Sequence, residues 1–161
     1  MSSSRAAATE KVAASGPERL WETHVGSDLA FLLARANARS LAGAHAALAP
    51  FGLKARSYSV LALAASDARP TQRELSDFLR LDPSQIVALI DDLAARGLVR
   101  REPDPADRRV KVVVATVKGR ALHEEAYRGA EQAEIETFAG LTDEQRDRFT
   151  VLLRGLAADV L

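Results

Sequence analysis

The sequence contains no cysteine, and this absence excludes several classes of site at once. Without thiols there is no disulfide, no zinc site with thiolate ligands and no sensing of oxidants through sulfur chemistry. The three histidines, His24, His45 and His123, are scattered and lack the spacing of metal ligands. We therefore expect neither a metal nor a cofactor.

Aromatic residues and long apolar runs are also scarce. Aromatic residues make up 5% of the 161-residue chain, whereas apolar residues make up 47%, many of them alanine. Small, helix-favouring side chains in this proportion predict one mainly helical domain. No apolar run could span a membrane, and the N-terminal stretch lacks the apolar core of a secretory signal. We expect a cytoplasmic protein in which residues 1–17 form a disordered or loosely helical arm.

The chain has no excess of either charge, with 22 basic and 22 acidic residues. Taken alone, this balance argues against binding to nucleic acid. The charges are segregated, however. Residues 96–120 contain eight basic and three acidic residues, and residues 121–161 contain four and nine. Because local fields depend on such segregation, the basic block is a candidate binding region.

Apolar residues at helical spacing predict long helices before and after a central region. We expect helices at about residues 25–49 and 55–66, separated by Pro50 and Gly52. Towards the C-terminus we expect helices at about residues 117–140 and 142–161.

Two helix start signals lie close together in the centre of the chain. In TQRE, Thr71 is placed to cap a helix and Glu74 to reach back to it, as in a capping box. In DPSQ, Asp82 suits the N-cap and Pro83 suits the first helical position. The two short helices, expected at residues 71–79 and 83–96, predict a helix-turn-helix.

A β-hairpin is expected directly afterwards. Strands at about residues 98–101 and 110–115 enclose a loop with Pro103, Pro105 and several charges. A helix-turn-helix followed at once by a hairpin is the plan of a winged helix. The predicted fold class is therefore mainly α with a small β-hairpin wing.

We expect four segments along the chain. They are the arm at 1–17, N-terminal dimerisation helices at 18–53, a winged helix-turn-helix at 54–116 with its wing at 98–115, and C-terminal dimerisation helices at 117–161. The terminal helices carry apolar stripes too extensive for a small domain to cover. We expect them to pair with a second copy in a two-fold dimer.

Four stretches carry a resemblance to a known family. They are PFGLKARSYSVL, TQRELSDFL, SQIVALIDDLAARGLVRR and DRRVKVVVATVKGRAL. Together they resemble the MarR (multiple antibiotic resistance regulator) family over about residues 29–156, with Ala115 where the family shows leucine. The resemblance implies a homodimer that binds pseudo-palindromic DNA, with recognition helices in the major groove and wings in the minor groove. It also implies a repressor that a small aromatic acid or phenol releases from DNA.

The wing tip supplies the first candidate DNA contacts. Arg108 and Arg109 are expected there, where an arginine can enter a narrow, A·T-rich minor groove. Asp107 is expected to hydrogen-bond Arg109 and stabilise the wing. The alternative is an ordinary solvated hairpin tip, which the preceding helix-turn-helix disfavours.

The start of the recognition helix supplies further candidates. Ser84 and Gln85 lie in its first turn, and glutamine can pair with adenine, although capping is an equal alternative for Gln85. Ala88 is a third candidate at the DNA surface, but it stands where the family often has a basic residue, so this helix is short of base-reading groups. Four residues are expected to contact phosphates, with a plain surface role as an equal alternative: Thr71, Gln72, Arg73 and Arg80.

The effector site is predicted less directly. The candidate residues are Trp21, Phe31, Arg35 and Tyr58, although aromatic residues at helical spacing are more often part of the core. Ser59 counts against urate, because urate-responsive relatives carry an acidic residue at that position.

Two other functions stay open beside the DNA-binding regulator. Zero net charge and a polar-poor recognition helix allow a winged-helix module that dimerises and binds protein without binding DNA. An enzyme is the other alternative, but the sequence has no phosphate loop or nucleophile elbow. The pairs Asp91–Asp92 and Glu124–Glu125 are interpreted as solvated helix faces. We therefore expect a regulator and no enzyme.

Overall fold

The computed structural model describes residues 16–158 and divides the chain into two compact units, residues 1–38 and 39–161. Helices and a two-stranded antiparallel hairpin make up the structure, so the predicted fold class is confirmed. Of the arm expected at residues 1–17, only Gly16 and Pro17 are among the described residues, and they begin a short 3-10 helix. Among residues 16–158, no helix is long and apolar enough to cross a membrane.

The first unit consists of two 3-10 helices and the beginning of α1. These are η1 (Gly16–Glu22), η2 (His24–Ser27) and α1 (Leu29–Leu48), which continues into the second unit. The helix expected to start at Val25 starts four residues later. Asp28 explains the difference, because its Oδ1 accepts a hydrogen bond of 2.8 Å from the Phe31 N–H and so caps the helix. Apolar spacing predicts that a helix exists but does not place its first residue.

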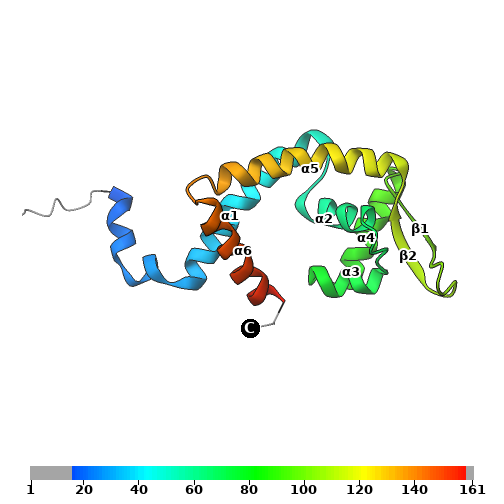
Figure 1. Ribbon diagram of the computed structural model, residues 1–161, viewed down its shortest axis with the longest axis horizontal. Coiled ribbons are helices and arrows are strands. Elements are labelled where there is room, and N and C mark those ends of the chain that lie inside the picture. Colours follow the sequence, from blue (N-terminus) through cyan, green and yellow to red (C-terminus); the bar gives the residue numbers. More distant parts are fainter. Residues whose placement is uncertain (1–15, 159–161) are drawn as a thin grey trace, which may run out of the picture. The chain divides into compact units, whose positions relative to one another are not determined.

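The second unit contains the rest of α1, all the later helices and the hairpin (Figure 1). Gly52 adopts a positive φ of 62°, which lets the chain turn sharply after the short helix η3 (Ala49–Phe51). The elements that follow are α2 (Ala55–Ala65), α3 (Gln72–Leu79), α4 (Pro83–Ala95), β1 (Val99–Pro103), β2 (Lys111–Ala115), α5 (Val117–Thr137) and α6 (Asp143–Ala157). The last helix was expected to reach Leu161, which lies outside the described residues.

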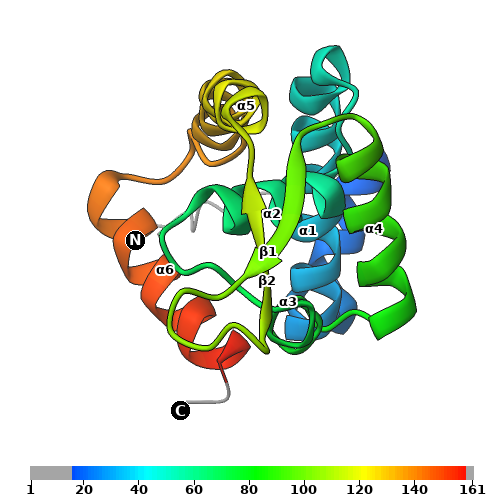
Figure 2. The same cartoon turned by 90° about the vertical axis from the view of Figure 1, so that its right-hand side faces the viewer.

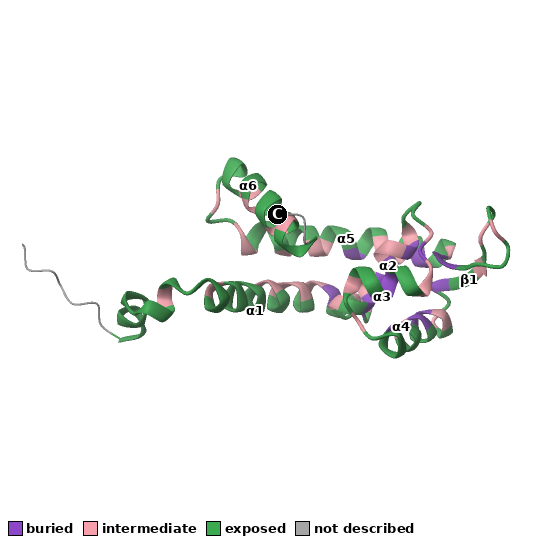
Figure 3. Ribbon diagram, turned by 90° about the horizontal axis from the view of Figure 1, so that it is seen from below, coloured by how far each residue is buried: buried purple, intermediate pink, exposed green. Residues whose placement is uncertain are grey.

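One core joins the helix-turn-helix to the hairpin. Leucine, isoleucine and valine side chains from α2, α3, α4 and both strands of the hairpin meet there and are almost completely buried. Figure 3 shows the buried residues gathered around these elements, whereas α6 has none. Each such side chain contributes about 1.5–3 kcal/mol through its burial. The largest side chains of the core are Leu48, Leu61, Leu75, Ile86, Ile90, Leu93 and Leu98.

The hairpin pairs Val99 with Ala115 at its base and Pro103 with Lys111 near its tip (Figure 2). The first strand was expected to end at residue 101, with Pro103 in the loop, and this expectation was wrong. Pro103 is accommodated because it occupies the last pair, where a missing N–H interrupts no interior part of the ladder. The Val113 N–H also donates to the Pro70 carbonyl at 2.8 Å, which attaches the wing to the segment before α3.

Candidate nucleic-acid interface

The first helix of the helix-turn-helix begins with the capping box that the sequence predicts. The Glu74 N–H donates to Thr71 Oγ1 at 3.2 Å, and the Thr71 N–H donates to Glu74 Oε2 at 2.7 Å. The hydrogen bond from the Thr71 backbone lowers the pKa of Glu74 below its usual value. The Thr71 hydroxyl is therefore engaged within the protein, as a helix cap.

The N-terminal turn of α4 is exposed along the side that the sequence assigns to DNA. Ser84, Gln85, Val87 and Ala88 are all exposed there. Gln85 also caps the helix, because its Oε1 accepts a hydrogen bond of 3.3 Å from the Asp82 N–H. The exposed surface of this turn thus combines two polar side chains with two apolar ones.

The wing tip holds its arginines in the open. Arg109 has a side chain that is 91% exposed, and it forms two hydrogen bonds with Asp107. Its Nε donates to Oδ1 at 3.0 Å and its Nη2 donates to Oδ2 at 2.9 Å, while the Arg109 N–H also donates to Oδ1. The guanidinium of Arg109 holds the pKa of Asp107 below its ordinary value. The predicted hydrogen bonding of Asp107 with Arg109 is confirmed, and Arg108 beside it is also exposed.

Arg101, which sequence reasoning missed, links the wing to both helices of the helix-turn-helix. Its Nε donates to Gln72 Oε1 on α3, and its Nη2 donates to Asp91 Oδ1 on α4 at 2.7 Å. Asp91 lies on a solvated helix face, as expected, since its side chain is 58% exposed, and it also pairs with Arg101 there. Gln72, expected at a phosphate, has its side-chain oxygen occupied by this contact.

On the opposite side of β1, Arg69 and Arg100 both form hydrogen bonds with Glu102. Arg69 Nη2 donates to Glu102 Oε1 at 2.6 Å, and Arg100 Nε donates to Glu102 Oε2 at 2.9 Å. Both arginines lower the pKa of Glu102, with the Arg69 hydrogen bond as the largest cause. Side chains alternate along a strand, so Glu102 and Arg101 leave β1 on opposite sides. That alternation, applied to the VRRE stretch, predicts only that the two side chains leave on opposite sides, and the packing decides which residues they meet.

The remaining expected phosphate contacts lie on or beside α3. Arg73 has a side chain that is 92% exposed and lies 3.8 Å from Asp77 Oδ2. Arg80 ends the helix in the left-handed region, with φ of 50°, and its residue is exposed. Both positions leave a basic side chain at the surface of the helix-turn-helix.

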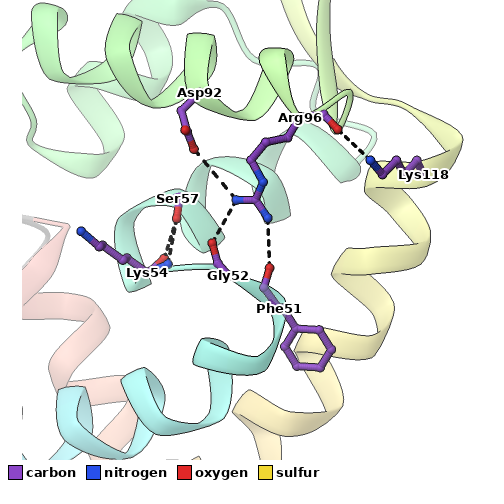
Figure 4. Close-up of polar contacts among 7 residues, drawn as sticks. All are labelled: Phe51, Gly52, Lys54, Ser57, Asp92, Arg96 and Lys118. Atoms are coloured by element: carbon purple, nitrogen blue, oxygen red, sulfur yellow. Dashed lines mark hydrogen bonds and ion pairs between the residues drawn. The ribbon is translucent and has the colours of Figure 1, made fainter.

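Arg96 fastens the far end of the recognition helix (Figure 4). Its Nη1 donates to the Gly52 carbonyl and its Nη2 to the Phe51 carbonyl, both at 3.0 Å. Lys118 Nζ on α5 donates to the Arg96 carbonyl at 2.9 Å. The C-terminal end of α4 is thereby attached both to the turn before α2 and to the start of α5.

A cleft between α2 and α5 contains Tyr58, one of the expected effector residues. It consists of two adjoining cavities of about 220 Å³ and about 320 Å³, which share Tyr58, Ala130 and Glu134. The Tyr58 ring stacks on His123 at 5.8 Å, and the Tyr127 hydroxyl donates to Glu131 Oε1 at 3.0 Å. Sequence reasoning missed these α5 residues, although Tyr127 and Glu131 stand four positions apart on a predicted helix.

The other expected effector residues gather in the first unit. Arg35 lies 5.0 Å from the centre of the Trp21 ring, in cation–π geometry, and Trp21 meets Phe31 edge-on at 6.3 Å. Trp21 is 47% exposed and Phe31 is 38% exposed, so neither is a core residue in the single chain. Among residues 16–158 no group of three or more histidine or acidic side chains is placed to hold a metal ion.

Comparisons with known proteins agree with this geometry. A profile of the MarR family matches residues 51–110. The uncharacterized HTH-type transcriptional regulator YwoH of Bacillus subtilis (strain 168) is 31% identical over 107 residues, which cover 66% of this chain and 77% of the relative. The chain belongs to the MarR family.

Two MarR-family neighbours of known structure extend the comparison to nearly the whole fold. CouR from Rhodococcus jostii RHA1, bound to p-coumaroyl-CoA, is 40% identical with a TM-score of 0.79, covering 84% of this chain and 95% of that one. BpsR from Bordetella bronchiseptica, whose DNA binding is regulated by 6-hydroxynicotinic acid, is 31% identical with a TM-score of 0.74, covering 84% and 96%. The fold described above is therefore that of MarR-family regulators.

Proposed function

We propose that this MarR-family chain is a homodimeric, sequence-specific DNA-binding repressor that a small aromatic effector releases from its operator. The observation that carries the proposal is that two exposed elements, the start of α4 and the wing, belong to the same hydrophobic core. The first turn of α4 and the arginines of the wing tip both face solvent, and hydrogen bonds join β1 to α4 and to the segment before α3.

In this proposal α4 enters the major groove and the wing follows the backbone into the adjacent minor groove. Gln85 must leave its cap before its amide can form two hydrogen bonds with adenine. Arg109 needs no such rearrangement, because Asp107 already holds its guanidinium at the tip. A pre-aligned arginine loses little side-chain entropy on entering a narrow minor groove. The wing therefore contributes a large share of the affinity.

Phosphate contacts fall to the basic side chains that remain at the surface. Arg73 and Arg80 are both exposed on or beside α3. Thr71 and Gln72 stay candidates for phosphate contacts, and their side chains also form hydrogen bonds within the protein. Asp107 stabilises the wing in this scheme by fixing its tip.

Dimerisation rests on the apolar side chains that the terminal helices leave exposed. On α6, Val151, Leu152 and Leu156 are 70%, 57% and 56% exposed. A second copy of the chain is the partner that covers such a stripe with an identical one, as in a two-fold interface. The segments at residues 18–53 and 117–161 are the proposed dimerisation region.

A protein-binding module without DNA affinity is the second candidate. It is favoured by Val87, which is 39% exposed on the recognition helix, and by a cavity of about 440 Å³ that Val87 and Pro83 line with α3. An apolar spot of this kind suits a protein side chain better than a base edge.

Fluorescence anisotropy with DNA from upstream of the chain's own gene separates the two candidates. Unlabelled upstream DNA and unrelated DNA of equal length serve as competitors. We expect the upstream DNA to compete roughly a thousandfold better or more, as for other specific DNA-binding proteins. Equal competition by unrelated DNA would contradict sequence-specific binding, and the absence of binding to any DNA would support the protein-binding module.

A further inference from the structure

The cleft between α2 and α5 has walls that carry net negative charge. Glu131 and Glu134 line it, and the basic side chain among its lining residues is Arg146. Arg146 is already paired, because its Nη2 lies 3.3 Å from Asp143 Oδ1. A ligand that enters the cleft therefore meets two carboxylates and one arginine whose charge is largely balanced.

The tyrosines of the cleft reflect the same surroundings. Burial, followed by the nearby Tyr127, Glu131 and Glu134, raises the pKa of Tyr58. The hydrogen bond to Glu131 is the largest cause that raises the pKa of Tyr127. Both phenols disfavour a negative charge on themselves, and a ligand carboxylate placed beside them is disfavoured for the same physical reason.

Arg146, one of the lining residues of the cleft, also carries an unsatisfied hydrogen-bond donor. The Nε of Arg146 is buried and has no hydrogen-bond partner among the described residues. A buried N–H without a partner is costly, so a ligand acceptor that reaches it is favoured. A neutral carbonyl oxygen supplies such an acceptor without adding negative charge next to Glu131 and Glu134.

We propose that this cleft selects aromatic acyl compounds in a neutral form, as the amide, ester or thioester, and rejects the corresponding free carboxylate. The proposal rests on the proposed function in taking the cleft as the effector site. It replaces the aromatic acids of the expected class with their acyl derivatives, because the carboxyl group of an aromatic acid is ionised at pH 7 whereas the carbonyl group of its amide, ester or thioester is uncharged. The proposed ligand class is similar to the ligand of CouR, which is an acyl thioester. It differs from the effector of BpsR, which is a free acid.

The test is isothermal titration calorimetry with ligands that share one ring. The probes are 4-hydroxycinnamic acid, its amide, its methyl ester and its thioester with coenzyme A, each titrated into the full-length chain without DNA. We expect the affinity for the amide and the methyl ester to be at least about tenfold higher than for the acid. A difference of this size corresponds to one partly screened contact between like charges. Equal affinity for acid and amide overturns the proposal, and so does the absence of binding by all four probes.

The coenzyme A thioester distinguishes two sources of the same chemistry. If it binds as the methyl ester does, the acyl group carries recognition and simple esters or amides are sufficient. If it binds far more tightly, the nucleotide part adds contacts outside the cleft. Both results agree with selection of a neutral acyl group.

Variants that remove the charge of Glu131 or Glu134 test whether these carboxylates cause the rejection of the free acid. Glu134→Gln and Glu131→Gln preserve side-chain shape on the exposed surface of α5 and should improve binding of the free acid about tenfold while changing the amide little. Glu125→Gln is the matched control, because Glu125 is exposed on the same helix and is not among the lining residues of the cleft. Unchanged affinity of the acid in both variants, or an equal gain in the control, contradicts the proposal.

Because these titrations contain no DNA, they separate the two proposals. Failure of the chain to bind its upstream DNA would overturn the proposed function and leave the ligand selectivity intact. Loss of selectivity among the probes would overturn this inference and leave DNA binding intact.

Discussion

At the residue scale, Arg109 both faces solvent and forms hydrogen bonds with Asp107, and the sequence alone does not show that one side chain does both. Arg109 is almost fully exposed, yet both of its side-chain donors towards Asp107 are in use. An exposed ion pair of this kind contributes little to stability. Its consequence is geometric, since it fixes the direction of a cation that faces solvent.

Replacing Arg109 should therefore affect binding and spare the fold. We expect Arg109→Ala to weaken operator affinity by about 10-fold to 100-fold, which corresponds to about 1–3 kcal/mol. Fluorescence anisotropy measures the affinity, and thermal unfolding should change little. Arg154→Ala on α6 is the control. Unchanged operator affinity in Arg109→Ala would exclude the wing as a major DNA contact.

At the element scale, the start of α3 depends on one ionisable side chain. The pKa of Glu74 is lowered in the folded protein, so its carboxylate stabilises the fold above the pKa it has in the unfolded chain. This stabilisation is lost as pH falls through the lower pKa of the folded state. The relevant window therefore lies at and below about pH 4.5, near the ordinary glutamate pKa.

A variant that cannot ionise should reveal this window. We expect Glu74→Gln to have a lower melting temperature than the unmodified chain at pH 7, with the gap narrowing as the pH falls below about 4.5. Differential scanning calorimetry from pH 7 to pH 3 measures it. Glu144→Gln, at an exposed position on α6, is the control. A gap that stays constant across this range would show that the Glu74 carboxylate makes no pH-dependent contribution.

The wing and the recognition helix are joined by a partly exposed link. Arg101 spans from β1 to α3 and α4, and its side chain is 33% exposed. We expect Arg101→Met to cost at most about 1 kcal/mol of unfolding free energy, since the pair is only partly buried. Operator affinity should fall further, about tenfold, because the wing loses its fixed position relative to α4.

Denaturant unfolding and anisotropy, measured on the same Arg101→Met preparation, test this difference. Arg100→Met is the matched control, since Arg100 lies next to it on the opposite side of β1 and contacts Glu102. Equal losses of affinity in the two variants would argue against a positioning role specific to Arg101.

At the scale of the whole molecule, the terminal helices leave apolar side chains exposed, and the proposed dimer covers them. We expect Leu152→Asp to convert the dimer into monomers at micromolar concentration, because it places a charge within the proposed two-fold interface. Analytical ultracentrifugation measures the state. Arg154→Asp, at an exposed polar position on a different face of the same helix, is the control. A Leu152→Asp chain that stays dimeric would remove α6 from the interface.

The neutral net charge of the molecule does not prevent strong salt dependence. Binding to DNA releases counterions from each neutralised phosphate, so log affinity should fall linearly with log salt with a slope of about −0.9 per contact. Arg73→Ala should reduce the slope by about one unit. Anisotropy titrations between 50 and 300 mM salt, about the range over which such slopes are measured, test this. An affinity independent of salt would contradict a phosphate interface.

Much of the fold was predictable because its signals are local. Thr71 and Glu74 form a capping box through atoms three residues apart, and Gly97 follows the end of α4 in a positive φ conformation that suits glycine. The β-branched run at residues 111–115 forms the expected strand. Such features depend on neighbours along the chain, so the sequence alone determined them, together with the order of elements that places the chain in the MarR family.

Only the tertiary structure decided which distant side chains meet. Arg101 finds Gln72 and Asp91 across 29 and 10 positions of sequence, and Arg96 reaches carbonyls 44 and 45 positions away. The charge of the cleft at Tyr58 likewise depends on how α5 and α6 approach α2. These contacts follow from how the helices and the hairpin pack, and no local pattern records that packing. The sequence by itself therefore determined the kind of protein, and the packing decided how its wing is held and which charged side chains line its cleft.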